Sequence, residues 1–168
     1  MRVLYSETGE KTIPSEKVDT RYNRAIVDIS DARAKRRIRG LQLLEKIGVA
    51  DLFDWCVLQL EDESVDVICN ALRIMQRCDA GYTAPILVHA ESQQKRIRAS
   101  AIAALATHAS DDTEHWFERG LKDSEACVRM EVARLLPTLD RTEHRDIFDL
   151  ARHDPNPAVK RSAKKRHS

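Results

Sequence analysis

One short pattern recurs along this chain at intervals of 30 or 31 residues, and it constrains the fold more than any other feature. We number it from a reference position, the anchor. The anchors are Arg36, Val67, Ile97, Val128 and Val159. Self-similarity at a fixed period in this range indicates a repeat architecture, in which each copy packs against its neighbours.

An Asp or a Ser stands five residues before each anchor. These residues are Asp31, Asp62, Ser92, Asp123 and Asp154. The side-chain oxygen of either residue type accepts hydrogen bonds from free backbone N–H groups at a turn or at the start of a helix. The column therefore predicts an N-cap or a turn between two helices at five places.

Apolar residues follow each turn at helical spacing. Positions 0, +4 and +8 from an anchor lie on one face of a helix, so they predict a buried stripe. Position +4 is small in most copies, which lets a neighbouring helix approach closely. The +4 residues are Gly40, Ala71, Ala101, Val132 and Ala163, and the +8 residues are Leu44, Met75, Leu105 and Leu136.

A basic residue directly follows most anchors. These residues are Arg37, Arg98, Arg129 and Lys160, with Ile68 as the exception. We expect each one to reach an Asp of an adjacent copy, which would give a ladder of paired charges along the molecule. Arg36, which stands where an aliphatic anchor is expected, Ser92 and Ile68 depart from the pattern and weaken this ladder locally.

A second helix fits between successive copies, in segments 50–61, 81–91, 112–121 and 142–152. Pro85 requires the helix in 81–91 to begin near Thr83 or to be kinked there. Segment 15–29 supplies the first partner helix, ahead of a helix over 33–47. These segments predict five helical hairpins in a single domain over residues 13–168, preceded by a tail of residues 1–12.

The pattern D-x-x-x-x-[VI]-[RK]-x-x-A-x-x-x-L resembles the HEAT repeat family, in the short form of its phycobilisome-lyase-like group. The resemblance covers residues 15–166. It implies an all-α fold, a right-handed α-solenoid or superhelix of about five antiparallel hairpins. It also implies that the helices after the Asp turns line the concave side. Members of this family are mostly scaffolds that bind proteins or nucleic acids.

Basic residues gather in the helices that follow the Asp turns, although the net charge of the chain is only +1. A basic concave groove would attract an acidic protein surface or a phosphate backbone. Ladder pairs within the molecule would explain part of the same pattern. The candidate groove residues are Arg39, Arg73, Arg98, Arg129, Arg134 and Lys165.

No catalytic constellation stands out, so we expect no cofactor, no metal and no small-molecule substrate. The triplet TEH occurs at 113–115 and 142–144, but successive hairpins lie too far apart for His115 and His144 to share one ion. We expect Thr113 and Thr142 to be N-caps instead.

The four cysteines have no metal-ligand spacing and fit helical apolar patterns, which favours buried thiols. No apolar run reaches the length of a membrane helix, and the first residues lack the apolar core of a secretory signal. These features predict a cytoplasmic protein that does not associate with membranes.

The function we expect is that of a non-catalytic HEAT-repeat scaffold that binds a protein partner with an acidic surface through its concave face. One alternative is a nucleic-acid binder with a basic groove, similar to HEAT-like DNA repair glycosylases. Another is an accessory subunit of an enzyme such as a bilin lyase, which rests on likeness of fold alone.

Overall fold

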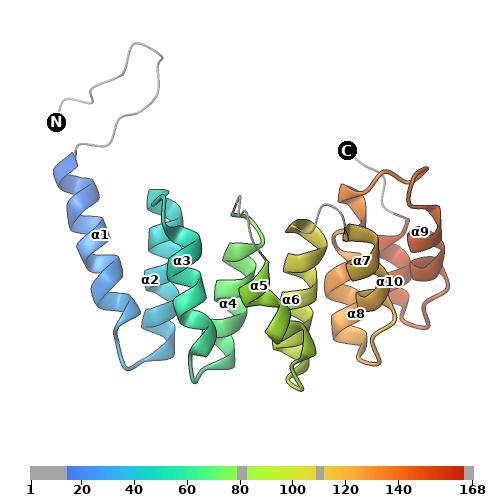
Figure 1. The fold of residues 1–168 in the computed structure, drawn as a ribbon, viewed down its shortest axis with the longest axis horizontal. Coiled ribbons are helices and arrows are strands. Elements are labelled where there is room, and N and C mark those ends of the chain that lie inside the picture. Colours follow the sequence, from blue (N-terminus) through green and yellow to red (C-terminus); the bar gives the residue numbers. More distant parts are fainter. Residues whose placement is uncertain (1–14, 79–82, 109–111, 165–168) are drawn as a thin grey trace, which may run out of the picture.

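The computed structural model describes residues 15–78, 83–108 and 112–164 (Figure 1). Throughout these ranges the regular structure is helical, and no strand occurs in them. The predicted all-α class is therefore confirmed. The expected tail of residues 1–12 and the candidate groove residue Lys165 lie outside the described residues.

The first two hairpins agree closely with the segments that the repeat predicts. The first joins α1 (Ser15–Ile29) to α2 (Ala34–Ile47). In the second, α3 (Leu52–Leu58) runs on into the 3-10 helix η1 (Gln59–Glu61) and packs against α4 (Val65–Met75).

Three more hairpins follow in the described residues. The third joins α5 (Ala84–Leu87) and the 3-10 helix η2 (Val88–Glu91) to α6 (Lys95–His108). The fourth joins α7 (Thr113–Leu121) to α8 (Ala126–Ala133), after which comes the 3-10 helix η3 (Leu136–Thr138). The fifth joins α9 (Arg145–Arg152) to α10 (Pro157–Ser162).

The hairpins follow one another in a row from α1 to the pair α9 and α10 (Figure 1). We call α2, α4, α6, α8 and α10 the even helices, and α1, α3, α5, α7 and α9 the odd helices. Each even helix packs against the next even helix in the series. The helices that open after the Asp turns therefore form one continuous layer.

The core lies within each hairpin and between neighbouring hairpins. The anchors Val67, Val128 and Val159 are fully buried, and so are the +4 residues Ala71 and Ala101. Burying a side chain of the size of Val or Leu contributes roughly 1.5–3 kcal/mol. The buried stripe is thus confirmed, and its burial stabilises the packing of each hairpin against the next.

Gly40, the +4 residue of the first copy, lets α1 and α2 come very close. A Cβ atom at this position would lie 2.6 Å from Ile29 Cγ1, 2.7 Å from the backbone nitrogen of Ile29 and 2.8 Å from the Ala25 carbonyl oxygen. Two of these three atoms belong to backbone, which cannot move aside as a flexible side chain can. Glycine is the residue that fits here without a shift of α1.

Prolines set two of the helix boundaries. Helix α5 begins at Ala84 after its N-cap Thr83, as Pro85 predicts. Helix α8 ends at Ala133, and Leu136 stands in a 3-10 turn with Pro137, which has no N–H group to continue an α-helix. Leu136 is still fully buried, so the stripe continues past the end of the helix.

The predicted N-caps at the two TEH triplets are wrong. The N-cap of α7 is Asp112, and the N-cap of α9 is His144. At the second triplet the Asp140 carboxylate accepts hydrogen bonds from the backbone N–H groups of Thr142 and Glu143, at 2.7 and 3.2 Å. An Asp just outside the triplet therefore shapes the turn that Thr142 was expected to cap.

Candidate binding face

Each of the five Asp or Ser residues forms a tight turn with its own backbone. Its side-chain oxygen accepts the N–H of the residue two positions later, at 2.7 to 3.2 Å. The N-cap is that later residue, such as Ser64 for α4 or Asn156 for α10. The column therefore makes inter-helix turns, as predicted, and not the N-caps themselves.

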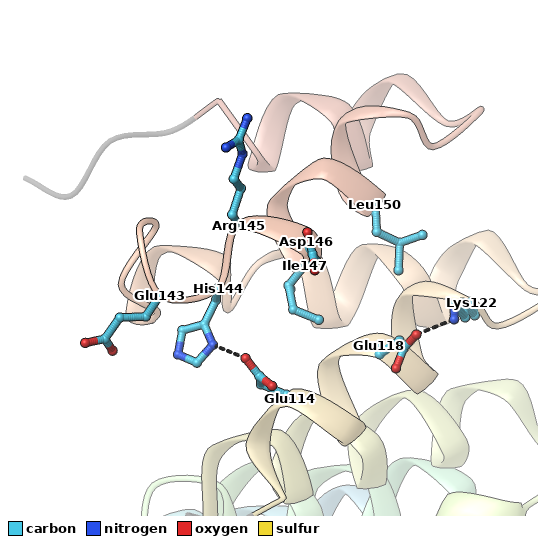
Figure 2. A pocket seen from close by; sticks show the side chains of 9 residues that line it. All are labelled: Glu114, Glu118, Lys122, Glu143, His144, Arg145, Asp146, Ile147 and Leu150. Carbon is cyan, nitrogen blue, oxygen red and sulfur yellow. Dashed lines mark hydrogen bonds and ion pairs between the residues drawn. The ribbon is translucent and has the colours of Figure 1, made fainter.

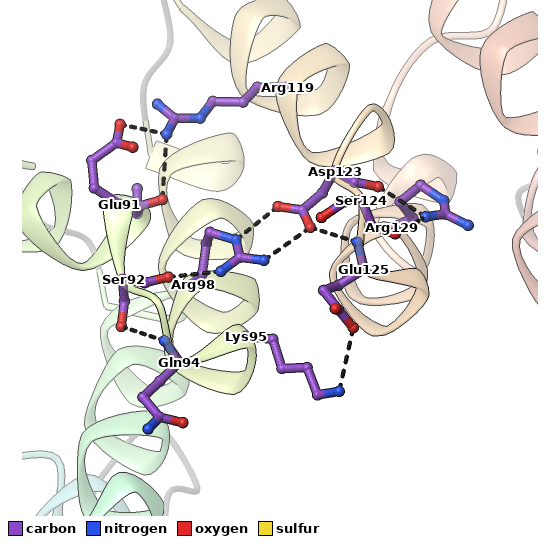
Figure 3. A network of polar contacts seen from close by, with 11 residues as sticks. Glu91, Ser92, Gln94, Lys95, Arg98, Arg119, Asp123, Ser124, Glu125 and Arg129 are labelled. Atoms are coloured by element: carbon purple, nitrogen blue, oxygen red, sulfur yellow. Dashed lines mark hydrogen bonds and ion pairs between the residues drawn. The ribbon is translucent and has the colours of Figure 1, made fainter.

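The arginine after the anchor binds the Asp turn of the next copy, and this confirms the ladder (Figure 3). Arg98 donates from Nε and Nη2 to the two carboxylate oxygens of Asp123, at 2.8 and 3.1 Å. Its Nη1 donates to the carbonyl of Ser92 in its own turn, at 2.7 Å. One side chain thus ties its own turn to the next one.

We call each such pair of an Arg and the Asp of the next copy a rung. The same arrangement recurs at two other rungs. The Nε atom of Arg37 lies 2.7 Å from Asp62 Oδ2, and that of Arg129 lies 2.7 Å from Asp154 Oδ2. The carboxylates of these pairs are mostly buried. Bidentate pairs between a guanidinium and a carboxylate are among the strongest hydrogen-bonded pairs in proteins.

The two departures from the pattern are the two halves of one missing rung. Ile68 stands where the second copy would supply its cation, and Ser92 stands where the third copy would supply the acid. A lone buried Arg or Asp would be an uncompensated charge, whereas loss of both partners together leaves none. Ile68 is buried, as an apolar replacement should be.

The ladder also governs the protonation of its carboxylates. Burial tends to raise the pKa of Asp123, but hydrogen bonds from Arg98 and from the backbone N–H of Glu125 outweigh it and lower the pKa below its usual value. The pKa of Asp62 is lowered in the same way, with burial opposed by Arg37 and by the backbone of Ser64. Both acids are therefore held in the charged form.

The ladder divides the predicted groove residues into two groups. Arg98 and Arg129 have side chains only 17% and 13% exposed, with their donors engaged in rungs, so they offer little to a ligand. Arg39, Arg73 and Arg134 are exposed on α2, α4 and beside the end of α8. These three are the described groove residues that remain open to a partner.

Two of these arginines meet over the middle of the even-helix layer. Arg73 Nε lies 3.9 Å from Glu131 Oε1, and Arg134 Nη1 lies 3.2 Å from Glu131 Oε2. Helix α6 lies between α4 and α8 in the series and carries Ser100 and Ala103 at the matching positions, both almost fully buried. Small residues on α6 let the long side chains from both neighbours meet above it.

Three arginines converge on a buried acid at the start of the row. The Asp28 side chain on α1 is fully buried, and it is approached by Arg24 Nε at 3.5 Å, Arg36 Nη1 at 3.3 Å and Arg39 Nε at 3.5 Å. The motif search missed Asp28. The available clue was Arg36, which occupies an anchor position where the other copies have an aliphatic residue.

We define the even-helix face as the surface formed by positions +3 and +6 of the even helices. Its described members that are exposed or half-buried are Arg39, Gln42, Asn70, Arg73, Glu131, Arg134 and Ser162, while Ser100 and Ala103 lie buried beneath it. Two arginine clusters lie on or beside this face, and in each the guanidinium groups outnumber the carboxylates. Arg24, Arg36 and Arg39 surround Asp28, with Asp31 also near Arg36, and Arg73 and Arg134 share Glu131. The face therefore carries local positive charge that the molecule itself does not neutralise.

A separate cleft of about 380 Å³ lies between α7 and α9 (Figure 2). Two of the carboxylates that line it have partners: His144 Nδ1 lies 2.8 Å from Glu114 Oε1, and Glu118 pairs with Lys122. His115 instead packs edge-to-face on Trp116, with ring centroids 5.1 Å apart. In the described ranges no group of three His, Cys, Asp or Glu side chains is placed to hold a metal ion.

The cysteines behave as packing residues. All four are free thiols, and Cys56 and Cys69 are buried as predicted, while Cys78 and Cys127 are half-buried. Burial raises the pKa of Cys56 to about 12, so its thiol stays protonated at neutral pH. A protonated, buried thiol is neither a nucleophile nor a metal ligand.

Comparison with known proteins does not assign the chain to a family. No protein-family model matches the chain, and no curated protein matches it. Among the described helices, none has both the length and the apolar character that a membrane crossing requires.

Proposed function

We propose that this chain is a cytoplasmic, non-catalytic HEAT-repeat scaffold that binds a protein partner through its even-helix face. In this proposal the row of hairpins is a right-handed α-solenoid, and the even helices line its concave side. The repeat period and the continuous contacts from one even helix to the next support this arrangement.

The observation that carries the proposal is the excess of exposed guanidinium groups at two points on or beside the face. Arg24, Arg36 and Arg39 share the Asp28 carboxylate, and Arg73 and Arg134 share that of Glu131. Arginine presents a planar set of donors that matches carboxylates well. The partner should therefore offer acidic side chains at two separate places.

The spacing of the charges favours a protein over a nucleic acid. A phosphate backbone carries charge at short, regular intervals and is best matched by an unbroken series of free cations. Here other cations of α6 and of the turn that follows α4 are paired within the molecule. These pairs are Arg77 with Glu45 at 2.8 Å, Arg96 with Asp66 at 2.6 Å and Lys95 with Glu125 at 3.3 Å.

Affinity capture with matched variants tests the proposal. The tagged chain, the variant Arg39→Glu/Arg134→Glu and the control Arg145→Glu/Arg152→Glu would each be incubated with extract of the native host. The control suits the purpose because Arg145 and Arg152 also share one carboxylate, that of Asp149, but lie on α9. We expect the same partner on the wild type and the control, and at least about tenfold less on the first variant. Equal capture by both variants would show that this face does not bind the partner.

Salt dependence separates the nucleic-acid alternative. Binding to a mixed-sequence DNA duplex should weaken by about 0.9 log units per neutralised phosphate for each log unit of salt. We expect no binding of this kind that depends on Arg39 and Arg134. A steep salt slope that disappears in Arg39→Glu/Arg134→Glu would replace the protein partner with a nucleic acid.

A further inference from the structure

Exposed apolar side chains recur at one repeat position on the odd helices. The position nine residues before the anchor holds Val27, Leu58 and Val88, which are 63%, 66% and 76% exposed. They lie on α1, at the end of α3 and in η2. Single exposed apolar residues are common, but three at the same repeat position are not explained by packing within the chain.

Two neighbouring hairpins concentrate this apolar surface. Leu87 precedes Val88 and is also exposed. We call Leu58, Leu87 and Val88 the outer patch. Leu58 ends α3, and Leu87 and Val88 lie at the junction of α5 and η2, so the two halves of the patch belong to the first helices of two successive hairpins in the row (Figure 1).

The surroundings of the outer patch are acidic and contain no Lys or Arg of their own. Residues 50–61 include the exposed acids Asp51, Asp54 and Glu61 and no Lys or Arg, and residues 83–94 include Glu91 and likewise no Lys or Arg. Beyond these stretches, Arg37 pairs with Asp62 and Glu63, Arg96 pairs with Asp66, and Arg119 of α7 donates to Glu91. The outer patch therefore combines exposed apolar side chains with nearby carboxylates.

We propose that the outer patch docks an amphipathic segment of a second protein, in which apolar residues are flanked by Lys or Arg. Apolar side chains would cover Leu58, Leu87 and Val88, and the cations would meet Glu61 and the other acids of residues 50–61. An acidic segment would be repelled. The patch lies on the odd helices, so this partner does not compete with one on the even-helix face.

A second copy of the chain fits the patch poorly. Its own odd-helix side carries the same acids and would be repelled. Its basic even helices offer a single large exposed apolar side chain in the described residues, Met130. A partner that combines basic and apolar residues in one segment satisfies both features of the patch.

Peptide binding tests this proposal directly. The probes are a helical peptide of Leu and Lys with one apolar face, about 18 residues long, and the same peptide with Glu for every Lys. Binding would be followed by fluorescence anisotropy for wild type, Leu58→Ser/Val88→Ser and the control Met130→Ser. We expect the Leu/Lys peptide to bind the wild type and the control, and the double variant about tenfold more weakly.

Three further measurements control for folding, for binding through the even-helix face and for self-association. Thermal melts should show that the exposed substitutions leave the fold intact. Arg39→Glu/Arg134→Glu should keep its peptide binding, so failure of this inference is distinct from failure of the proposed function. Equal binding by Leu58→Ser/Val88→Ser, binding of the Leu/Glu peptide, or no binding to the wild type would overturn the proposal. Sedimentation that shows wild-type dimers and monomeric Leu58→Ser/Val88→Ser would assign the patch to a second copy instead.

Discussion

The arginine that follows three of the anchors, Arg37, Arg98 or Arg129, performs two tasks with one side chain. Arg98 satisfies the Ser92 carbonyl of its own turn and, at the same time, holds the Asp123 carboxylate of the next turn. The turn that precedes a helix is thereby tied to the hairpin that follows. A single residue type at one repeat position explains why neighbouring copies keep the same relative placement.

Gly40→Ala should destabilise the protein, even though alanine is the better helix former by about 1 kcal/mol. The new Cβ would clash with the backbone of Ile29 and Ala25, and overpacking of this kind costs about 1–3 kcal/mol. Urea unfolding would measure the change in the free energy of unfolding. Unchanged or increased stability would show that α1 can shift away from α2 at little cost.

Removal of one partner of a rung should cost more than removal of both. Arg98→Ile leaves the Asp123 carboxylate mostly buried without its cation, which should lower the free energy of unfolding by about 3 kcal/mol. Arg98→Ile/Asp123→Ser reproduces the natural pair Ile68 and Ser92, and it should be at least about 1 kcal/mol more stable than Arg98→Ile alone. A double-mutant cycle measures the difference, and simple additivity would contradict the account of the missing rung.

At the scale of the secondary-structure elements, the rungs make the free energy of unfolding depend on pH. Because the pKa of Asp123 is lowered on folding, its contribution is fully present above the ordinary Asp pKa of about 3.9 and is lost as the pH falls toward the lowered value. The stability difference between wild type and Arg98→Ile/Asp123→Ser should therefore shrink on acidification below about pH 4. Urea unfolding at neutral and acidic pH checks this, and a difference that grows in acid would reverse the assigned sign.

Helix positions were predictable because the repeat sets them several times over. The helix boundaries of one copy can be transferred to the others through the repeat period. A helix that its own residues indicate only weakly, such as those in segments 81–91 and 15–29, is therefore predicted by the other copies. Caps were less predictable, since Thr113 and Thr142 look like caps only if the helix starts beside them. At the second site Asp140, two residues before Thr142, forms the turn, and the N-cap of α9 is His144.

The candidate face was predictable only in part. A list of arginines does not reveal which ones are exposed, and Arg98 and Arg129 entered the ladder while Arg39 and Arg134 remained open. The Asp28 cluster escaped notice because burial of an acid depends on how α1 meets α2. The outer patch escaped notice because a helical apolar pattern predicts burial, not the exposure that Leu58 and Val88 show.

At the scale of the whole molecule, the basic even helices and the acidic segments on the odd side give the row two different faces. An elongated stack exposes both faces along its length, whereas a compact bundle would cover one of them. The proposed solenoid therefore underlies both binding proposals. This proposal is supported by hairpins that bury their apolar stripes against neighbouring copies.

Small-angle X-ray scattering of the full chain tests that arrangement most directly. A compact domain of this length has a radius of gyration of about 15 Å. We expect a clearly larger value and a pair-distance distribution with a long tail, as a row of hairpins requires. A radius near the compact value with a single symmetric peak would contradict the stacked arrangement.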